Sequence, residues 1–131
     1  MPLPVLPDAE TLAVQALAAQ ASVAALVGSR IYAVTPDAPT FPLIRVSKVA
    51  ERFTDEEGAE DCTVQLDCIA STDAEASLLA RTVVAARKDM AGHYAAGWVA
   101  LVDVGSGPIP LHDTEAERYR YVVDLDMQVG Y

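Results

Sequence analysis

The chain has 131 residues, 52% of them hydrophobic and 21% charged, which is the composition of one globular domain with a buried core. Nineteen acidic residues against nine basic ones give a formal net charge of -10, which repels phosphate and excludes nucleic-acid binding by charge neutralisation. We therefore expect a single domain over residues 1–131, with residues 1–7 as an extended, proline-rich arm and residues 8–131 as the body. The opening MPLPVLPDAE has no basic residue before its apolar stretch, so no secretory signal is expected.

The N-terminal third predicts a helix, a short strand and a loop. Asp8 is a suitable N-cap for a helix beginning in AETLAVQALAAQ, Ser22 can restart the helix, and Gly28 can end it. Thr11 to Ser29 carries no charge, but alanines and two glutamines in it favour a buried helix over a membrane span. RIYAV then predicts a short strand, and TPDAPTFP, with three prolines, predicts a loop.

The middle of the chain predicts a long hairpin followed by a second helix. PLIRVSKVAERF and DCTVQLDCIA predict the two strands, with an acidic tip at Thr54–Asp61. Cys62 and Cys68 fall on one face of the second strand, about 20 Å apart, too far for a disulfide, as in a reduced intracellular protein. STDAEASLLARTVVAARKDMAG opens with Thr72 and Glu75 at capping-box spacing and predicts a helix that ends near Gly92. Its apolar stripe comprises Leu78, Leu79, Val83, Ala86 and Met90.

The last third predicts two strands joined by a long loop. GWVALVDV predicts a strand, Gly105–Glu117 a loop, and RYRYVVDLDMQVGY a final strand. From Tyr119, alternate residues are apolar, and thirteen extended residues would span about 43 Å against a body roughly 36 Å across, so the strand bends or projects. Together the elements predict an α+β fold: a largely antiparallel sheet of four to five strands, with two helices packed on one face.

Candidate catalytic groups are few. His93 and His112 are the neutral-pH bases, and both lie beside turn signals, so solvated loop histidines are expected. HDTE, His112 to Glu115, could supply metal ligands, and with Trp98 it supports the alternative of a small α+β enzyme or ligand-binding domain. Trp98 more simply anchors the core or an interface. We therefore expect no enzymatic activity, no cofactor and no metal.

The stretch VAALVGSRIYAVTPDAPTFPLIRVSKV combines a helix closing in Gly-x-Arg, an aliphatic-Tyr strand, a proline-broken loop and PLIRVS. With VQLDCIASTDAEASLLARTV and the alternating final strand, it resembles the tail-completion proteins of long-tailed bacteriophages, also called tail terminators or tail-to-head joining proteins. The resemblance spans roughly Ser22 to Val129 and contains no catalytic motif.

The resemblance implies a virion subunit at the tail-neck junction, assembled in the host cytoplasm. Six copies would form a ring that caps the tail tube, stops its polymerisation and gives the head-neck connector a docking surface. DNA would pass the lumen without specific binding, and no membrane is involved. Another tail or neck ring protein, such as a tube subunit or head-completion adaptor, is the alternative within this class.

A closed ring needs two different contact patches on each subunit, and three projecting segments are candidates: the acidic tip, the loop Thr35–Pro42 and the loop Gly105–Glu117. The final strand also carries opposite charges at its two ends, which could meet complementary charges on both neighbours, although a solvated face is the simpler interpretation. Reversing Asp124 and Asp126 to Lys is then expected to weaken ring assembly more than folding. The candidate assembly contacts are Asp37, Phe41, Asp55, Glu56, Glu57, His112, Asp113, Arg118, Arg120, Asp124 and Asp126.

Overall fold

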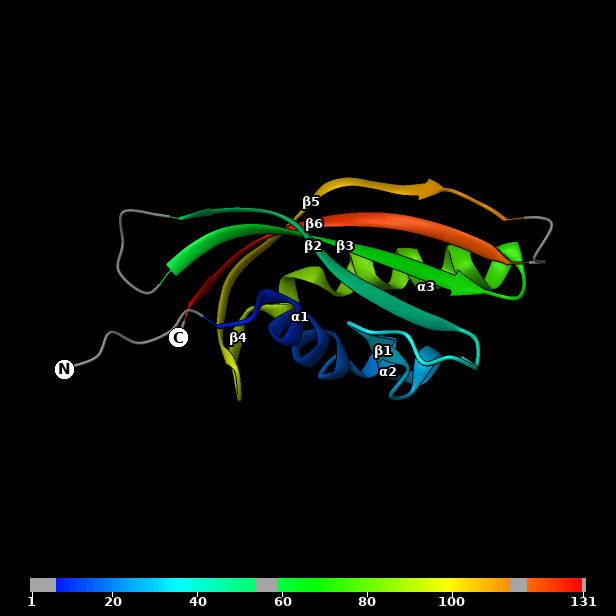
Figure 1. Ribbon diagram of the computed structural model, residues 1–131, viewed down its shortest axis with the longest axis horizontal. Coiled ribbons are helices and arrows are strands. Elements are labelled where there is room, and N and C mark those ends of the chain that lie inside the picture. Colours follow the sequence, from blue (N-terminus) through cyan, green and yellow to red (C-terminus); the bar gives the residue numbers. More distant parts are fainter. Residues whose placement is uncertain (1–6, 54–58, 114–117, 131) are drawn as a thin grey trace.

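A computed structural model describes residues 7–53, 59–113 and 118–130 of the chain (Figure 1). Three α-helices lie on one side of a curled, six-stranded sheet. In chain order the elements are α1 (Ala9–Ala18), α2 (Ala21–Val27), β1 (Ile31–Tyr32), β2 (Leu43–Phe53), β3 (Ala59–Ala70), α3 (Asp73–Ala86), the 3-10 helix η1 (Arg87–Met90), β4 (Gly92–Tyr94), β5 (Gly97–Pro110) and β6 (Tyr119–Gly130).

The sheet has the strand order β1-β2-β3-β6-β5-β4, and every pairing is antiparallel except that of the short β1 with β2. The terminal strand β6 lies inside the sheet and pairs with β3 over its whole length, from Tyr119 opposite Ala70 to Gly130 opposite Ala59. The predicted α+β class and long hairpin are therefore confirmed. The predicted four to five strands and two helices differ in detail, because β4 is only three residues long and the first helix is broken.

The break in the first helix falls at Gln20, whose extended backbone (ψ 113°) separates α1 from α2. Asp8 caps α1 as predicted, since its Oδ1 accepts the Glu10 N–H at 3.0 Å, and Gly28 ends α2 with a φ of 60°. Among the described residues, no single helix is long and apolar enough to cross a membrane. The pair α1 and α2 meets that test of length and composition only with a 92° bend between its halves.

The core lies between the helices and one face of the sheet. Val64 and Leu66 of β3, and Val123 and Leu125 of β6, are fully buried there, which confirms the predicted apolar parity of the last strand. The stripe predicted on α3 is wrong at one position, because Leu78 is 45% exposed. Leu78 lies about 100° around the helix from Leu79 and so points away from the sheet. The buried residues of this segment are Ala76, Leu79, Ala80, Val83, Ala86 and Met90.

Both cysteines are free and buried on the covered face of β3. Burial raises the pKa of the Cys62 thiol to about 12 and that of Cys68 further, so neither forms a thiolate readily at neutral pH.

The predicted loop Gly105–Glu117 is wrong in its first half, because β5 continues to Pro110 and pairs with β6 throughout. Register shifts between Val104 and Ser106 and between Ser106 and Ile109 take up the irregular residues of this segment. Gly107 has a φ of 91°, and a Cβ there would collide with the Val122 carbonyl. The prolines are tolerated because β4 covers β5 only at Gly97–Val99, which leaves the rest of that edge outside the ladder.

The predicted acidic tip Thr54–Asp61 is also shorter than expected, since β3 begins at Ala59. Glu60 is only 2% exposed, and its burial, together with a hydrogen bond to Glu51, raises its pKa above the ordinary range. Lys48 Nζ lies 2.7 Å from Glu51 Oε2, and this bond lowers the pKa of Glu51. The predicted contacts Asp55, Glu56 and Glu57 lie outside the described residues.

Candidate assembly surface

The sheet face opposite the helices is not covered by any described element (Figure 1). Side chains reach this face from alternate positions of β2, β3, β6 and β5, and strand pairing arranges them in rows. We call it the uncovered face. Two regions of the uncovered face differ in charge, and we call them the acidic half and the arginine half.

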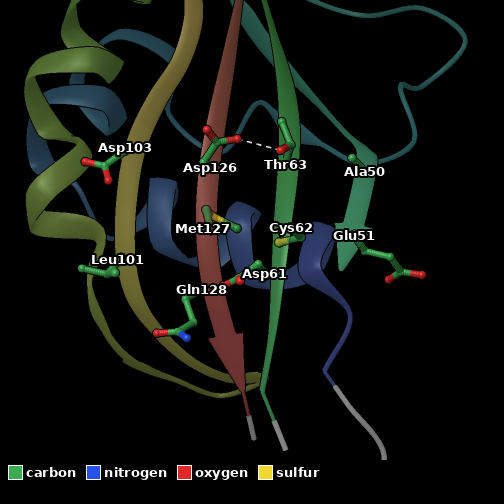
Figure 2. A pocket seen from close by; sticks show the side chains of 10 residues that line it. All are labelled: Ala50, Glu51, Asp61, Cys62, Thr63, Leu101, Asp103, Asp126, Met127 and Gln128. Carbon is green, nitrogen blue, oxygen red and sulfur yellow. Dashed lines mark hydrogen bonds between the residues drawn. The ribbon is translucent and has the colours of Figure 1, made fainter. Parts of the chain in front are cut away.

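The acidic half of the uncovered face lies toward the Gly130 end of β6. Asp103 of β5 pairs with Asp126 of β6, and the Asp126 Oδ1 accepts a hydrogen bond of 2.6 Å from Thr63 Oγ1 of β3 (Figure 2). Asp61 occupies the next row, between Arg52 of β2 and Gln128 of β6. Leu101, the partner of Gln128 on β5, is 61% exposed. The three aspartates, Thr63, Leu101 and Gln128 line a shallow pocket of about 400 Å³. Among the described residues, none of the three aspartates forms an ion pair, although like charges on paired strands repel.

Asp124 lies at the middle of the uncovered face and differs from Asp126. Its Oδ2 accepts a hydrogen bond of 2.9 Å from Ser106 Oγ, and its Oδ1 is buried without a partner among the described residues. Asp126, in contrast, is exposed. The two carboxylates that the sequence grouped together therefore differ in exposure, because Asp126 is exposed and Asp124 is partly buried.

The arginine half lies toward the start of β6 and contains three of the nine basic residues, Arg45, Arg118 and Arg120. Arg120 Nη1 is 3.9 Å from Oδ2 of the buried Asp67, a long contact that leaves much of the guanidinium accessible. Arg118 stands 4.3 Å from the ring centroid of Phe41, a cation-π contact that joins β6 to the segment before β2. A second pocket of about 420 Å³ opens here, lined by Ile69, Leu111, His112, Asp113, Arg118 and Arg120.

His112 fastens this end of the sheet to α3. Its Nδ1 accepts the Arg120 N–H at 3.2 Å, so the proton of a neutral ring sits on Nε2, which lies 2.9 Å from Asp73 Oδ1. Tyr121 Oη donates to the same oxygen at 2.8 Å, and this bond raises the pKa of Tyr121. We call His112, Asp73 and Tyr121 the clasp. His112 is thus hydrogen-bonded to two residues, Arg120 and Asp73. It lies in an exposed segment outside the strands, as predicted, but both of its ring nitrogens have protein partners.

The remaining predicted residues are dispersed. Asp37 is exposed in the segment between β1 and β2, and Asp113 and Arg118 exchange backbone hydrogen bonds of 2.9 Å. Trp98 begins β5 and lies opposite Gly130, so it is at the far end of the strand pair from His112, while Glu115 lies outside the described residues. No three metal-ligating side chains of the described residues come together. Trp98 and the HDTE segment therefore do not build a common site.

Several residues of this surface escaped sequence reasoning. Asp61 was assigned to the acidic hairpin tip, and the register of β3 places it in the sheet instead. Asp103 became notable only through its pairing with Asp126. Arg45 and Asp73 gained their roles in the same way, from strand order and from the approach of the β5 end to α3. The sequence shows charges on alternate residues of a strand, but it does not show the register in which neighbouring strands pair.

The fold and surface define a class: a small α+β subunit with one packed sheet face and one exposed, charge-divided face, and no assembled catalytic group among the described residues. The family described as tail completion protein gp17 matches residues 13–127, and the chain belongs to this family. It is therefore a structural protein of a bacteriophage-type virion tail. A chain in the solved structure "Virion of native gene transfer agent (GTA) particle" has a similar fold, with a TM-score of 0.64 and 22% identity over 94% of this chain and 95% of that chain. No curated protein matches the sequence significantly.

Proposed function

We propose that this chain is a tail terminator: a structural subunit that closes into a six-membered ring on the last ring of the tail tube. The ring stops tube polymerisation and gives the head-neck connector its docking surface, so the protein resides at the tail-neck junction of the virion. The observation that carries the proposal is membership of the tail completion family over residues 13–127. The fold shared with a chain of a gene transfer agent particle is consistent with it.

The charge of the subunit supports a place beside moving DNA. A formal net charge of -10 repels the phosphate backbone, so DNA can pass a lumen built from such subunits without adhering. No substrate is turned over in this role, and ring closure requires only complementary contact patches.

The decisive experiment is the solution mass of the purified chain by light scattering, with electron microscopy of the same sample. A terminator gives a single closed ring of six copies, both alone and at the end of purified tail tubes. A tube subunit instead gives filaments, and a head-completion adaptor gives rings that bind heads but not tube ends. Filaments, or failure to bind tube ends, would overturn the proposal.

A further inference from the structure

Edge-to-edge strand pairing, the simplest way for two sheets to associate, is obstructed at both edges of this sheet. β1 covers β2 at Ile44 and Arg45, and the Lys48 N–H further along β2 is already bonded to Glu10 Oε2 of α1 at 3.1 Å. The open part of β5 carries register shifts and Pro108, which natural sheets use to prevent edge pairing. These features disfavour an edge-to-edge contact between copies.

The uncovered face has the charge distribution that a head-to-tail contact needs. Asp103 and Asp126 in the acidic half lack a cationic partner among the described residues, and Arg118 in the arginine half forms no ion pair with them either. Each half also exposes an aliphatic side chain, Leu101 at 61% in the acidic half and Leu111 at 48% in the arginine half. The two halves are thus complementary to each other in charge, and both offer apolar surface.

The two halves cannot satisfy each other within one subunit. Six residues of extended β6 separate Asp126 from Arg120, which is about 20 Å along the strand. Ion pairs require contact within about 4 Å, so the carboxylates of one subunit can meet these arginines only on another molecule.

We propose that the acidic half of one subunit seats on the arginine half of a second copy of this chain, and that this repeated contact closes the ring. The inference rests on the proposed ring and adds to it the two patches that meet. Asp103 and Asp126 of one copy then lie against Arg118 and its neighbours on the next, with Leu101 and Leu111 in the same contact. In a ring each half meets a different neighbour, so the contact is heterologous, whereas two copies that satisfied both pairs at once would form an isologous dimer.

The test uses two single charge reversals of the full chain, Asp103→Lys and Arg118→Glu. Each places like charges in the contact, so each is expected to raise the concentration for half-maximal ring formation by about tenfold or more. The matched controls are Asp89→Lys and Lys88→Glu, which reverse exposed charges on the helical side and should leave the ring mass unchanged. Circular dichroism and thermal unfolding of each variant report whether the subunit is still folded.

Mixing the two variants gives the sharper result. When the variants alternate around a ring, the lysine introduced by Asp103→Lys faces the glutamate introduced by Arg118→Glu, and the two unaltered patches face each other at the next contact. The equimolar mixture should therefore form rings that contain both variants in equal numbers, at a concentration at which neither variant forms rings alone. If Arg118→Glu fails to fold, Arg45→Glu in the same half replaces it, since Arg45 is exposed and forms no ion pair with the described residues.

The outcomes separate the interface from the function. Variants that keep the wild-type ring mass would overturn the interface and leave the terminator proposal standing. Variants that form normal rings but no longer bind tail tubes would assign the uncovered face to the tube protein instead. A wild-type chain that stays monomeric, both alone and on purified tubes, would overturn the ring and the interface together.

Discussion

Leu125 and Leu101 lie on neighbouring strands but on opposite faces of the sheet, and their surroundings differ completely. Leu125 of β6 is fully buried beneath the helices, whereas Leu101 of β5 is 61% exposed and lines a pocket with Asp103 and Asp126. The covered face holds the subunit together, because it removes apolar surface from water. The uncovered face contributes little to that stability, so its residues are free to serve contacts with other molecules. Substitutions on the two faces should therefore separate folding from assembly.

The largest difference is expected between the same truncation on the two faces. Leu125→Ala should lower the free energy of unfolding by about 3 kcal/mol, because it removes buried methyl groups and leaves a cavity. Leu101→Ala should change it by less than about 0.5 kcal/mol, since the side chain is mostly in water already. Urea unfolding of both variants measures the difference. Equal losses would mean that the uncovered face is packed in the isolated subunit.

The alternation along the terminal strand was enough to predict which of its residues are buried, because a strand with one wet face must separate apolar from polar side chains. The helix restart predicted at Ser22 falls within two residues of the break at Gln20, although an alanine-rich pattern alone does not separate a restart from a continuous helix. β5 was ended too early at Gly105, because glycine and proline usually terminate strands and only an open edge with shifted register tolerates them. The alternation of residues along a strand thus predicts which face of the sheet each side chain lies on. It does not predict which strand lies beside it, which only the three-dimensional structure shows.

The same limit applies to the assembly surface. Arg118, Arg120 and Asp126 were predicted as one strand's outward charges, and the structure places all three on the uncovered face or at its edge. What β6 alone could not show is that Asp103 extends the acidic end and Arg45 the basic end, since both depend on strand order. Nor could it show that Asp124 is partly buried by Ser106. The proposed contact therefore uses Asp126, the more exposed of the two aspartates, and the prediction for Asp124 stays a prediction.

The clasp joins the arginine half of the sheet to α3, so a substitution in the clasp should also affect the stability of the fold. Asp73→Ala removes the one oxygen that accepts from both His112 and Tyr121, and it also removes an acid from the first turn of α3. We expect a loss of about 1 kcal/mol in the free energy of unfolding, a modest value because solvent screens the half-exposed carboxylate. Asp37→Ala, which removes an exposed aspartate without a described contact, is the control in the same urea titration. A loss no larger than that of the control would show that the clasp does not brace this end.

Glu60 is a buried carboxyl on the covered face, hydrogen-bonded to Glu51, and its burial makes the stability of the fold depend on pH. Its folded-state pKa is raised by burial, so the native protein holds this proton more firmly than the unfolded chain does. Stability contributed by Glu60 is therefore present below about pH 4.5 and is lost as the pH rises through the folded-state pKa. Glu60→Gln stays neutral and can still donate to Glu51, so it should raise the melting temperature at pH 7 and not at pH 4.

Glu51→Gln should change the melting temperature at pH 7 in the opposite direction to Glu60→Gln. The bond from Lys48 lowers the pKa of Glu51, so this carboxylate stabilises the fold above its unfolded pKa and ceases to do so in acid. Its replacement should lower the melting temperature at pH 7 and leave it nearly unchanged in acid. Melting curves of both variants from pH 3 to pH 8 give the comparison, and parallel curves for the two would contradict the assigned pKa directions.

The smallest effect on stability is expected at Asp103, and it carries the most information about the two faces. Asp103 pairs with Asp126 across β5 and β6, with its side chain turned away from that aspartate (Figure 2). Asp103→Asn removes one of two like charges, so it should raise the free energy of unfolding of the dilute monomer by about 0.5 kcal/mol or less, an effect that salt abolishes. Ring formation should weaken in the same variant, because the arginine half of the next copy loses an opposing charge.

A variant that stabilises the subunit while it weakens the assembly identifies a residue retained for contact and not for folding. Asp37→Asn, at an exposed position outside the sheet, should change neither quantity. If Asp103→Asn strengthens the ring together with the fold, the acidic half is repelled in the assembly and cannot be the surface that meets the arginines. If the free energy of unfolding and ring formation both fall, Asp103 has a partner within its own subunit. In that case this residue of the uncovered face also stabilises the fold.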